Sequence, residues 1–168
     1  MPRLFVAINL NEEMKESLMD MQDVMYEHGM RGRETSPENM HLTLAFIGDF
    51  DDVDLVKEAV ESIEVRPFRI KLSGIGAYGD LWWAGLENSP PLMAVGRRLR
   101  RALAEAGVPF DRKKFSPHVT LMRRATGTAK DIPAGELEEC FGASMSVDHI
   151  SLMRSDRGKH GMIYTELT

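Results

Sequence analysis

The strongest constraint on the fold is a pattern that occurs twice. Residues 41–44 read His-Leu-Thr-Leu and residues 118–121 read His-Val-Thr-Leu, and both copies lie in apolar stretches. Successive side chains of a β-strand point to opposite faces, so each copy presents an imidazole and a hydroxyl on one face and two apolar side chains on the other. If the two strands lie side by side, they form one pocket that contains His41, Thr43, His118 and Thr120.

Length and composition favour one compact domain over residues 1–168. The chain has 168 residues with 43% apolar content, which is enough for one substantial core. The single cysteine, Cys140, cannot form an internal disulfide, so we expect a buried or half-buried thiol in a reducing, cytoplasmic environment. The apolar run at residues 4–10 is broken by Asn9 and followed by two glutamates, which predicts a buried strand and neither a signal peptide nor a membrane span.

Charge argues against a protein that coats nucleic acid through a general phosphate field, because the net charge is −5. One basic neighbourhood surrounds the second motif, and no acidic residue interrupts it: Arg112, Lys113, Lys114, Arg123 and Arg124. A solvated surface explains this cluster nearly as well as a bound polyanion does. Any contact with RNA is therefore expected to be local.

Three helices are predicted from their end residues and apolar spacing. The first runs from an N-cap at Asn11 to Gly29, and the second begins at one of three aspartates near residue 52 and ends before Pro67. The third begins at Ser89, which two prolines follow, and ends near Gly107. Residues 30–39 are expected to be a polar loop, and residues around 127–135 a looser stretch.

Strands are predicted between these helices, so the fold class is α+β. They cover residues 3–10, the two motifs, residues 68–72, residues 81–84, and two closing strands at 146–154 and 162–167 joined by a turn at 155–158. The glycines at 74, 76 and 79 precede a strand and not a helix, which excludes a dinucleotide-binding loop. Each half contains a strand, a helix and a His-x-Thr strand, a pattern that indicates two lobes about a pseudo-twofold axis.

Two histidines with two threonines suit phosphoryl transfer without a metal. One neutral imidazole accepts a proton from water while one protonated imidazole donates to the leaving oxygen, and an ordinary imidazole pKa of about 6.5 suits both roles. Thr43 and Thr120 are placed to donate hydrogen bonds to the non-bridging phosphate oxygens, where charge accumulates.

A metal site is the main chemical competitor. A catalytic zinc generally has three protein ligands, and no third ligand is tied to the motif pair in the sequence. His28, His149 and His160 are expected to be structural or exposed. We therefore expect no metal and no cofactor.

The chain resembles the 2H phosphoesterases, and in particular the RNA 2′,3′-cyclic phosphodiesterases, also called 2′-5′ RNA ligases. The resemblance covers essentially the whole chain and is carried by the two motifs and by further segments: residues 3–8 (Arg-Leu-Phe-Val-Ala-Ile), residues 83–85 (Trp-Ala-Gly), residues 115–117 (Phe-Ser-Pro), residues 152–155 (Leu-Met-Arg-Ser) and Tyr164.

This resemblance implies a bilobal α+β fold, with antiparallel sheets that flank a central cleft and helices on the outside. It implies metal-independent hydrolysis of a 2′,3′-cyclic phosphate at an RNA end to a 2′-phosphate. Related members join or cleave 2′-5′ linkages in tRNA halves, so the implied partners are RNA ends or tRNA fragments. No membrane is implied, and a monomer is the default expectation.

The resemblance also assigns roles. His41 resembles the proton donor to the leaving 3′ oxygen and His118 the proton acceptor that activates water, while the two threonines hold the phosphate. Arg123 is the expected phosphate-binding arginine, with Arg124 as its less favoured neighbour. Ala45 stands where the family often has lysine, so that extra charge is not supplied.

Two alternatives stay open at the level of sequence. The first is a non-catalytic module that binds RNA ends, although two intact histidines exceed what binding alone needs. The second is a cyclic phosphodiesterase that acts on a small nucleotide.

Overall fold

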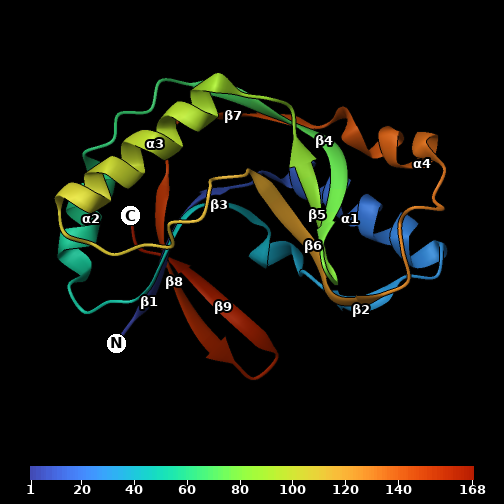
Figure 1. Ribbon diagram of the computed structural model, residues 1–168, viewed down its shortest axis with the longest axis horizontal. Coiled ribbons are helices and arrows are strands. Elements are labelled where there is room, and N and C mark those ends of the chain that lie inside the picture. Colours follow the sequence, from blue (N-terminus) through green and yellow to red (C-terminus); the bar gives the residue numbers. More distant parts are fainter.

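The computed structural model describes residues 1–168 and consists of two antiparallel sheets with helices on both sides (Figure 1). The first sheet has the strand order β3-β1-β8-β9 and the second has the order β2-β6-β5-β4-β7. The elements are β1 (Arg3–Asn9), α1 (Glu12–Glu27), β2 (Arg31–Glu34), η1 (Pro37–Asn39), β3 (His41–Asp49), α2 (Val53–Glu61), β4 (Phe68–Tyr78), β5 (Leu81–Leu86), α3 (Pro90–Glu105), β6 (His118–Thr126), α4 (Ala134–Glu138), η2 (Glu139–Gly142), β7 (Ser144–Val147), β8 (Ser151–Gly158) and β9 (Gly161–Glu166). This arrangement confirms the α+β class.

Local chemistry at the helix ends explains where the three long helices begin. The side chains of Asn11, Asp52 and Ser89 each accept a hydrogen bond from the backbone N–H three residues later, at 2.9, 3.1 and 3.3 Å. Each bond satisfies a backbone donor that the helix itself leaves free. The predicted caps at Asn11 and Ser89 are confirmed, and Asp52 is the one of the three aspartates that begins α2.

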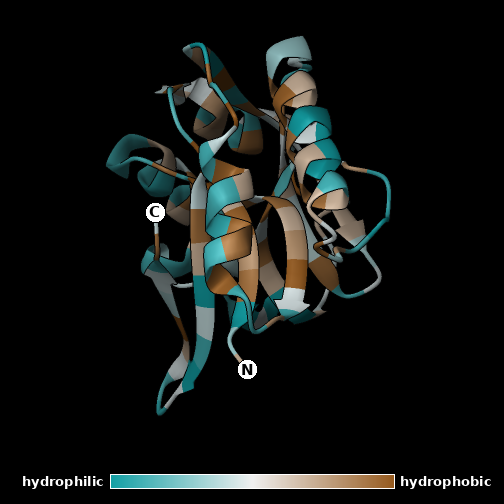
Figure 2. Ribbon diagram, turned by 90° about the vertical axis from the view of Figure 1, so that its left-hand side faces the viewer, coloured by the Kyte–Doolittle hydropathy of each residue, from teal (hydrophilic) through white to brown (hydrophobic).

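The apolar faces of both motif strands belong to one continuous buried cluster. Leu42, Leu44, Val119 and Leu121 are all in it, together with the methionines of the inner face of α1. Apolar segments accordingly gather in the interior of the molecule, whereas the tip of the projecting β8–β9 hairpin is hydrophilic (Figure 2). Both motif strands therefore point their apolar side chains into the same core.

A pseudo-twofold relation connects the two sheets. Strand β1 precedes α1 and pairs with β3, and strand β5 precedes α3 and pairs with β6. The order β3-β1-β8 in one sheet thus corresponds to β6-β5-β4 in the other. Helix α1, from the first half, packs against motif strand β6 of the second half. Helix α3, from the second half, packs against motif strand β3 of the first half.

Two sequence expectations about loops are wrong. Residues 31–34 form strand β2, which pairs with β6, although all four are exposed and show no apolar alternation. Residues 155–158 lie within β8, and the turn is at residues 159 and 160, between Gly158 and Gly161. Strand β2 exists because it pairs with the distant strand β6, which the local sequence does not report. Residues 155–158 instead extend a hairpin, because they pair with residues 161–164 just beyond the turn.

The second half differs from expectation in three more places. Strand β4 continues beyond residue 72 to Tyr78, and the predicted strand at 146–154 is divided into β7, which pairs with β4, and β8, which pairs with β1. The stretch expected to be loose contains the short helices α4 and η2. Cys140 is buried there, as predicted, and burial raises the pKa of its thiol.

No helix of the structure combines the length and the apolar character that a membrane crossing requires.

Gln22 is a buried polar residue of α1 that is hydrogen-bonded to the second motif strand, β6. Its Nε2 donates to the carbonyls of Leu121 and Thr35, both at 2.9 Å. We expect Gln22→Met to lower the free energy of unfolding by about 1 to 3 kcal/mol, because the carbonyl of Thr35 loses its side-chain donor and that of Leu121 keeps only the backbone N–H of Thr35. Urea denaturation measures this change, with Asp23→Asn on the exposed face of α1 as the control. Equal stability of the two variants would contradict this role of Gln22.

Candidate active site

The two motifs lie on strands of different sheets that contact each other, and not on neighbouring strands of one sheet. His41 and Thr43 share one face of β3, opposite Asn9 and Ala7 of β1. His118 and Thr120 share one face of β6, opposite Gly85 and Trp83 of β5. All four motif side chains are half-buried. The hypothesis of adjacent strands is thus corrected, because the site is formed between two sheets.

Both imidazoles are oriented by the same backbone contact. Nδ1 of His41 lies 2.7 Å from the carbonyl oxygen of Asn39, and Nδ1 of His118 lies 2.8 Å from that of Ser116. A carbonyl oxygen only accepts, so Nδ1 carries the hydrogen in both rings. Nε2 is then the atom of each ring that can exchange a proton with a substrate.

Each imidazole is also held by two aromatic rings. His41 contacts Phe5 and Tyr164, with ring centroids at 4.8 and 5.1 Å, and these two rings also contact each other at 5.1 Å. His118 lies beside Tyr78 and Trp83, with ring centroids at 5.7 and 6.0 Å. Aromatic contacts limit how far either imidazole can rotate, which keeps the two Nε2 atoms in defined positions.

A β-bulge follows each motif. In β3, Thr43 pairs with Ala7 and Ala45 pairs with Val6, which leaves Leu44 without a partner across the strand pair. The same shift in β6 leaves Leu121 without a partner, because Thr120 pairs with Trp83 and Met122 with Trp82. Two consecutive side chains are therefore buried after each threonine, and the outward face resumes one residue later than strict alternation predicts.

The bulge decides between the two candidate arginines. Strict period-two alternation would place Arg124 on the face of His118 and Thr120, but after the bulge Arg123 takes that position. Arg123 and His118 are both sources of positive charge at His41, whereas Arg124 is not among them. Arg124 is exposed and adopts the left-handed backbone conformation, with φ of 52°. The structure thus brings Arg123, and not Arg124, to the two histidines.

The carbonyl of the bulged leucine is held by a helix side chain in both halves. Gln22 of α1 donates to Leu121, and Arg100 of α3 donates to Leu44 through Nε and Nη2, each at 3.4 Å. Arg100 also donates through Nη1 to the carbonyl of Lys113, at 2.7 Å, in the segment that leads to His118. Arg100 therefore connects the first motif strand to the approach of the second.

The electrostatic environment of His41 favours its neutral form. Burial lowers the pKa of His41 most, and the positive charges of Arg123 and His118 lower it further, while the hydrogen bond to Asn39 acts in the opposite direction. A negatively charged group between the two histidines would oppose these effects. Binding of an anion there is therefore expected to raise the pKa of His41.

Two residues on the strand faces that carry the motif side chains were missed from sequence. Arg33 of β2 pairs with Arg123, so its side chain shares that face, and Asn9 pairs with His41. Asn9 donates to Glu166 through Nδ2 at 2.7 Å. No sequence pattern indicated either residue, because only strand pairing places them beside the motifs. Ala45 is buried in the core, which agrees with the absence of a charge at that position.

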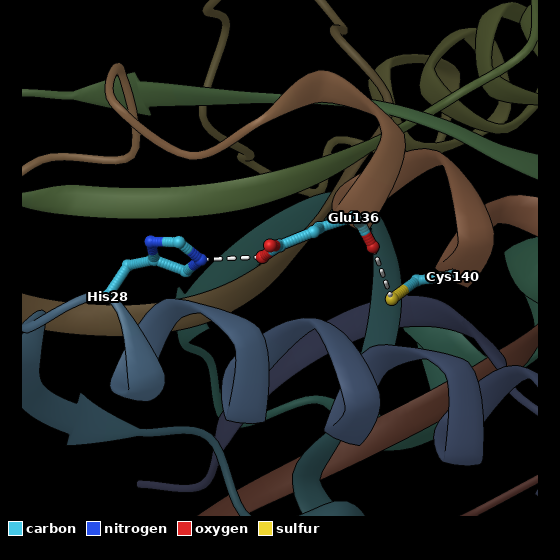
Figure 3. Close-up of polar contacts among 3 residues, drawn as sticks. All are labelled: His28, Glu136 and Cys140. Atoms are coloured by element: carbon cyan, nitrogen blue, oxygen red, sulfur yellow. Dashed lines mark hydrogen bonds and ion pairs between the residues drawn. The ribbon is translucent and has the colours of Figure 1, made fainter.

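The other histidines lie outside this constellation. His28 Nε2 pairs with Glu136 Oε2 at 2.5 Å, and the thiol of Cys140 donates to the carbonyl of the same glutamate at 3.7 Å, which ties the end of α1 to α4 and η2 (Figure 3). His149 pairs with Asp148, and His160 is exposed at the β8–β9 turn. No three His, Cys, Asp or Glu side chains gather in a metal-binding group.

Comparison with known proteins identifies the family. The family model described as the 2′-5′ RNA ligase superfamily matches residues 26–159. The chain belongs to this superfamily. The resemblance inferred from the two motifs is therefore confirmed. The matched range contains both histidines and both threonines of the motifs.

Relatives and solved structures that resemble this chain cover between about three quarters and nearly all of it. Proteins named RNA 2′,3′-cyclic phosphodiesterase from Escherichia coli and Methanothermobacter thermautotrophicus are 30% and 29% identical over 98% of the chain and 93% and 96% of their own lengths. One from Thermotoga maritima is 34% identical over 72% of the chain and 69% of its own length. The crystal structure of E. coli LigT in the apo form superposes with a TM-score of 0.85 at 28% identity, and covers 99% of this chain and 95% of that one.

Arg123→Gln is expected to raise the pKa of His41, because it removes a positive charge that disfavours the imidazolium ion. The pKa stays below its ordinary value, since burial is the larger cause. An NMR titration of the histidine ring protons measures the shift, and Arg124→Gln is the matched control. A larger shift in Arg124→Gln than in Arg123→Gln would contradict the assignment made from the bulge.

Proposed function

We propose that this protein hydrolyses 2′,3′-cyclic phosphate ends of RNA to 2′-phosphates, without a metal, through His41 and His118. The observation that carries this proposal is the matched geometry of the two imidazoles, each with Nδ1 bonded to the carbonyl two residues before it and Nε2 left for proton transfer. Relatives named RNA 2′,3′-cyclic phosphodiesterase support the substrate class. The single cysteine fits a reducing cytoplasm, and we propose a monomeric, single-domain enzyme.

In the proposed reaction, a water oxygen attacks phosphorus and the bond between phosphorus and O3′ breaks. His118 Nε2 accepts the proton that the water loses, and His41 Nε2 donates its proton to the departing O3′. The products are a 2′-phosphate and a free 3′-hydroxyl. If a 5′-hydroxyl of a second RNA replaces water, the same transfers produce a 2′-5′ linkage, and the reverse reaction exchanges the roles of the two histidines.

Charge stabilisation in this reaction is assigned to the threonines and to one arginine. Thr43 and Thr120 lie two residues after the histidines on the same strand faces, so their hydroxyls are positioned to donate to the non-bridging oxygens. Arg123 adds a positive charge on the same side. We do not assign a phosphate contact to Arg124.

The lowered pKa of His41 is compatible with its role as the acid. A protonated imidazole with a low pKa gives up its proton more readily, and the negative charge of the cyclic phosphate raises the pKa of His41 when substrate binds. Substrate binding and protonation of His41 are then coupled, so that the acid is formed where it is used.

One observation favours a small nucleotide as a second candidate substrate. A structure of E. coli LigT complexed with 3′-AMP, at a TM-score of 0.81 and 28% identity, shows that a mononucleotide binds that relative. We therefore consider a nucleoside 2′,3′-cyclic phosphate as the alternative, and compare it with a short RNA in the same assay.

His118→Ala and His41→Ala are each expected to lower kcat on a short RNA with a 2′,3′-cyclic phosphate end by about 10² to 10⁴, the range for one proton-transfer group. Product analysis in EDTA distinguishes 2′-phosphate from unreacted RNA. His149→Ala, at an exposed histidine, is the matched control and retains full activity. Full activity of either motif variant would contradict the acid-base pair, and recovery by zinc after EDTA treatment would support a metal site instead. Bound RNA without any wild-type product would favour the RNA-end-binding module.

The rate is expected to follow a bell-shaped pH dependence, because one histidine must be neutral and the other protonated. In kcat/KM, the limb assigned to His41 lies below about 6.5, since its pKa in the free enzyme is lowered. In kcat, the same limb lies at higher pH, because the bound phosphate raises that pKa. Steady-state kinetics at constant ionic strength tests both statements, and a flat profile from about pH 5 to 9 would show that neither proton transfer limits the rate.

A further inference from the structure

We propose that Tyr78, backed by Trp83, is the stacking platform for the nucleobase of the RNA end, and that this platform accepts any base. The inference rests on the proposed function, because it takes the phosphate to lie between the two histidines. It assigns a binding surface to the β4–β5 hairpin, for which neither motif of the sequence gives a role.

The strand register places Tyr78 and Trp83 on the face of the sheet that carries His118 and Thr120. Trp83 pairs with Thr120 of the second motif and with Gly76 of β4, so all three point to the same side of the sheet. Tyr78 follows Gly76 by two residues and therefore shares that side. Its ring lies 5.4 Å from that of Trp83 and 5.7 Å from that of His118.

Glycines allow the indole of Trp83 to lie flat on the sheet. A Cβ atom on Gly76 would be 2.3 Å from Cζ2 of Trp83, and one on Gly85 would be 3.4 Å from Cζ3 of the same ring. The indole occupies the space that side chains would take at these positions. Nε1 of Trp83 is buried and has no hydrogen-bond acceptor in the protein, so polar bonding within the fold does not explain its position. We infer that the indole supports the ring of Tyr78 above the sheet.

The two aromatic pairs of the site differ in how much of their rings is exposed to solvent. Phe5 is 4% exposed and packs with Ala7 and Met153, and Tyr164 is half-buried and contacts both Phe5 and the imidazole of His41, so that pair leaves little aromatic surface open. Tyr78 is 52% exposed at the end of β4. An exposed aromatic face beside a proton-transfer group is therefore found on the His118 side of the site.

The chemistry of an RNA end matches this position. The base of the terminal nucleotide is one ribose away from the 2′,3′-cyclic phosphate, and Tyr78 is the exposed ring next to the histidine that faces that phosphate. Single-stranded RNA is commonly bound by stacking of its bases on aromatic side chains. Every base has a π-face, so stacking on one tyrosine tolerates all four bases.

The test compares wild type with Tyr78→Ala, Tyr78→Phe and the matched control Tyr26→Ala, a tyrosine of α1 that is also 52% exposed and stacks on Arg31 away from the cleft. On a short RNA with a 2′,3′-cyclic phosphate end, Tyr78→Ala raises KM about tenfold, which corresponds to about 1.4 kcal/mol and lies within the range for stacking of one base. Tyr78→Phe and Tyr26→Ala keep the wild-type KM, and thermal denaturation verifies that all four proteins are folded.

A second RNA, whose terminal cyclic-phosphate ribose lacks a base, isolates the stacking contact. On this RNA, wild type has the raised KM and Tyr78→Ala causes no further increase. An unchanged KM of Tyr78→Ala on the complete RNA, with normal wild-type turnover, would overturn the platform and leave the proposed function intact.

Absence of turnover by wild type would overturn the proposed function. In that event, binding of an RNA with a 2′-phosphate end decides about the platform. Binding about tenfold weaker in Tyr78→Ala than in Tyr26→Ala supports it, and equal binding overturns it. RNAs that end in each of the four bases test the breadth of recognition, and a preference above about a hundredfold for one base would exclude stacking as the basis of selection.

Discussion

The positions of the two motif strands depend on hydrogen bonds that side chains of the two long helices donate to two backbone carbonyls, those of Leu44 and Leu121. Gln22 follows the first residue of α1, Glu12, by ten positions, and Arg100 follows the first residue of α3, Pro90, by the same ten positions. Each carbonyl belongs to the residue after the motif threonine, where the strand pairing is shifted. The helix that follows one sheet's strand thereby fixes the bulge on the other sheet, and the two lobes are joined at the residues that matter for the site.

The bulges have a direct consequence for the chemistry. A regular strand would continue to alternate after the threonine, and would place Arg124 beside the histidines. The extra residue buries Leu121 and Met122 together and turns Arg123 outward on the motif face. In the first half the same shift buries Leu44 and Ala45, so one copy of the motif is followed by a cation and the other by Phe46. The two nearly identical motifs are therefore followed by different side chains on the motif face, so the surroundings of His41 and His118 are unequal.

Several parts of the molecule were predictable because they depend on neighbours in sequence. The caps at Asn11 and Ser89 bond to N–H groups three residues away, and the alternation within each motif specifies which side chains are buried. Strand β2 was not predictable in this way. Arg31 to Glu34 carry no apolar pattern, and their strand exists because β6 offers backbone groups to pair with. Arg33 and Asn9 reach the site for the same reason.

The sequence by itself determined which side chains each motif presents together, because His-x-Thr in an apolar strand places an imidazole and a hydroxyl on one face wherever the strand lies. Two copies are what the proposed acid-base reaction needs. Tertiary structure decided the rest. It placed the motifs on two different sheets, brought Arg123 near His41, and left the ring of Tyr78 exposed beside His118. The physical reason is that these features arise from pairing and packing between residues far apart in the chain, whereas alternation along a strand is a property of consecutive residues.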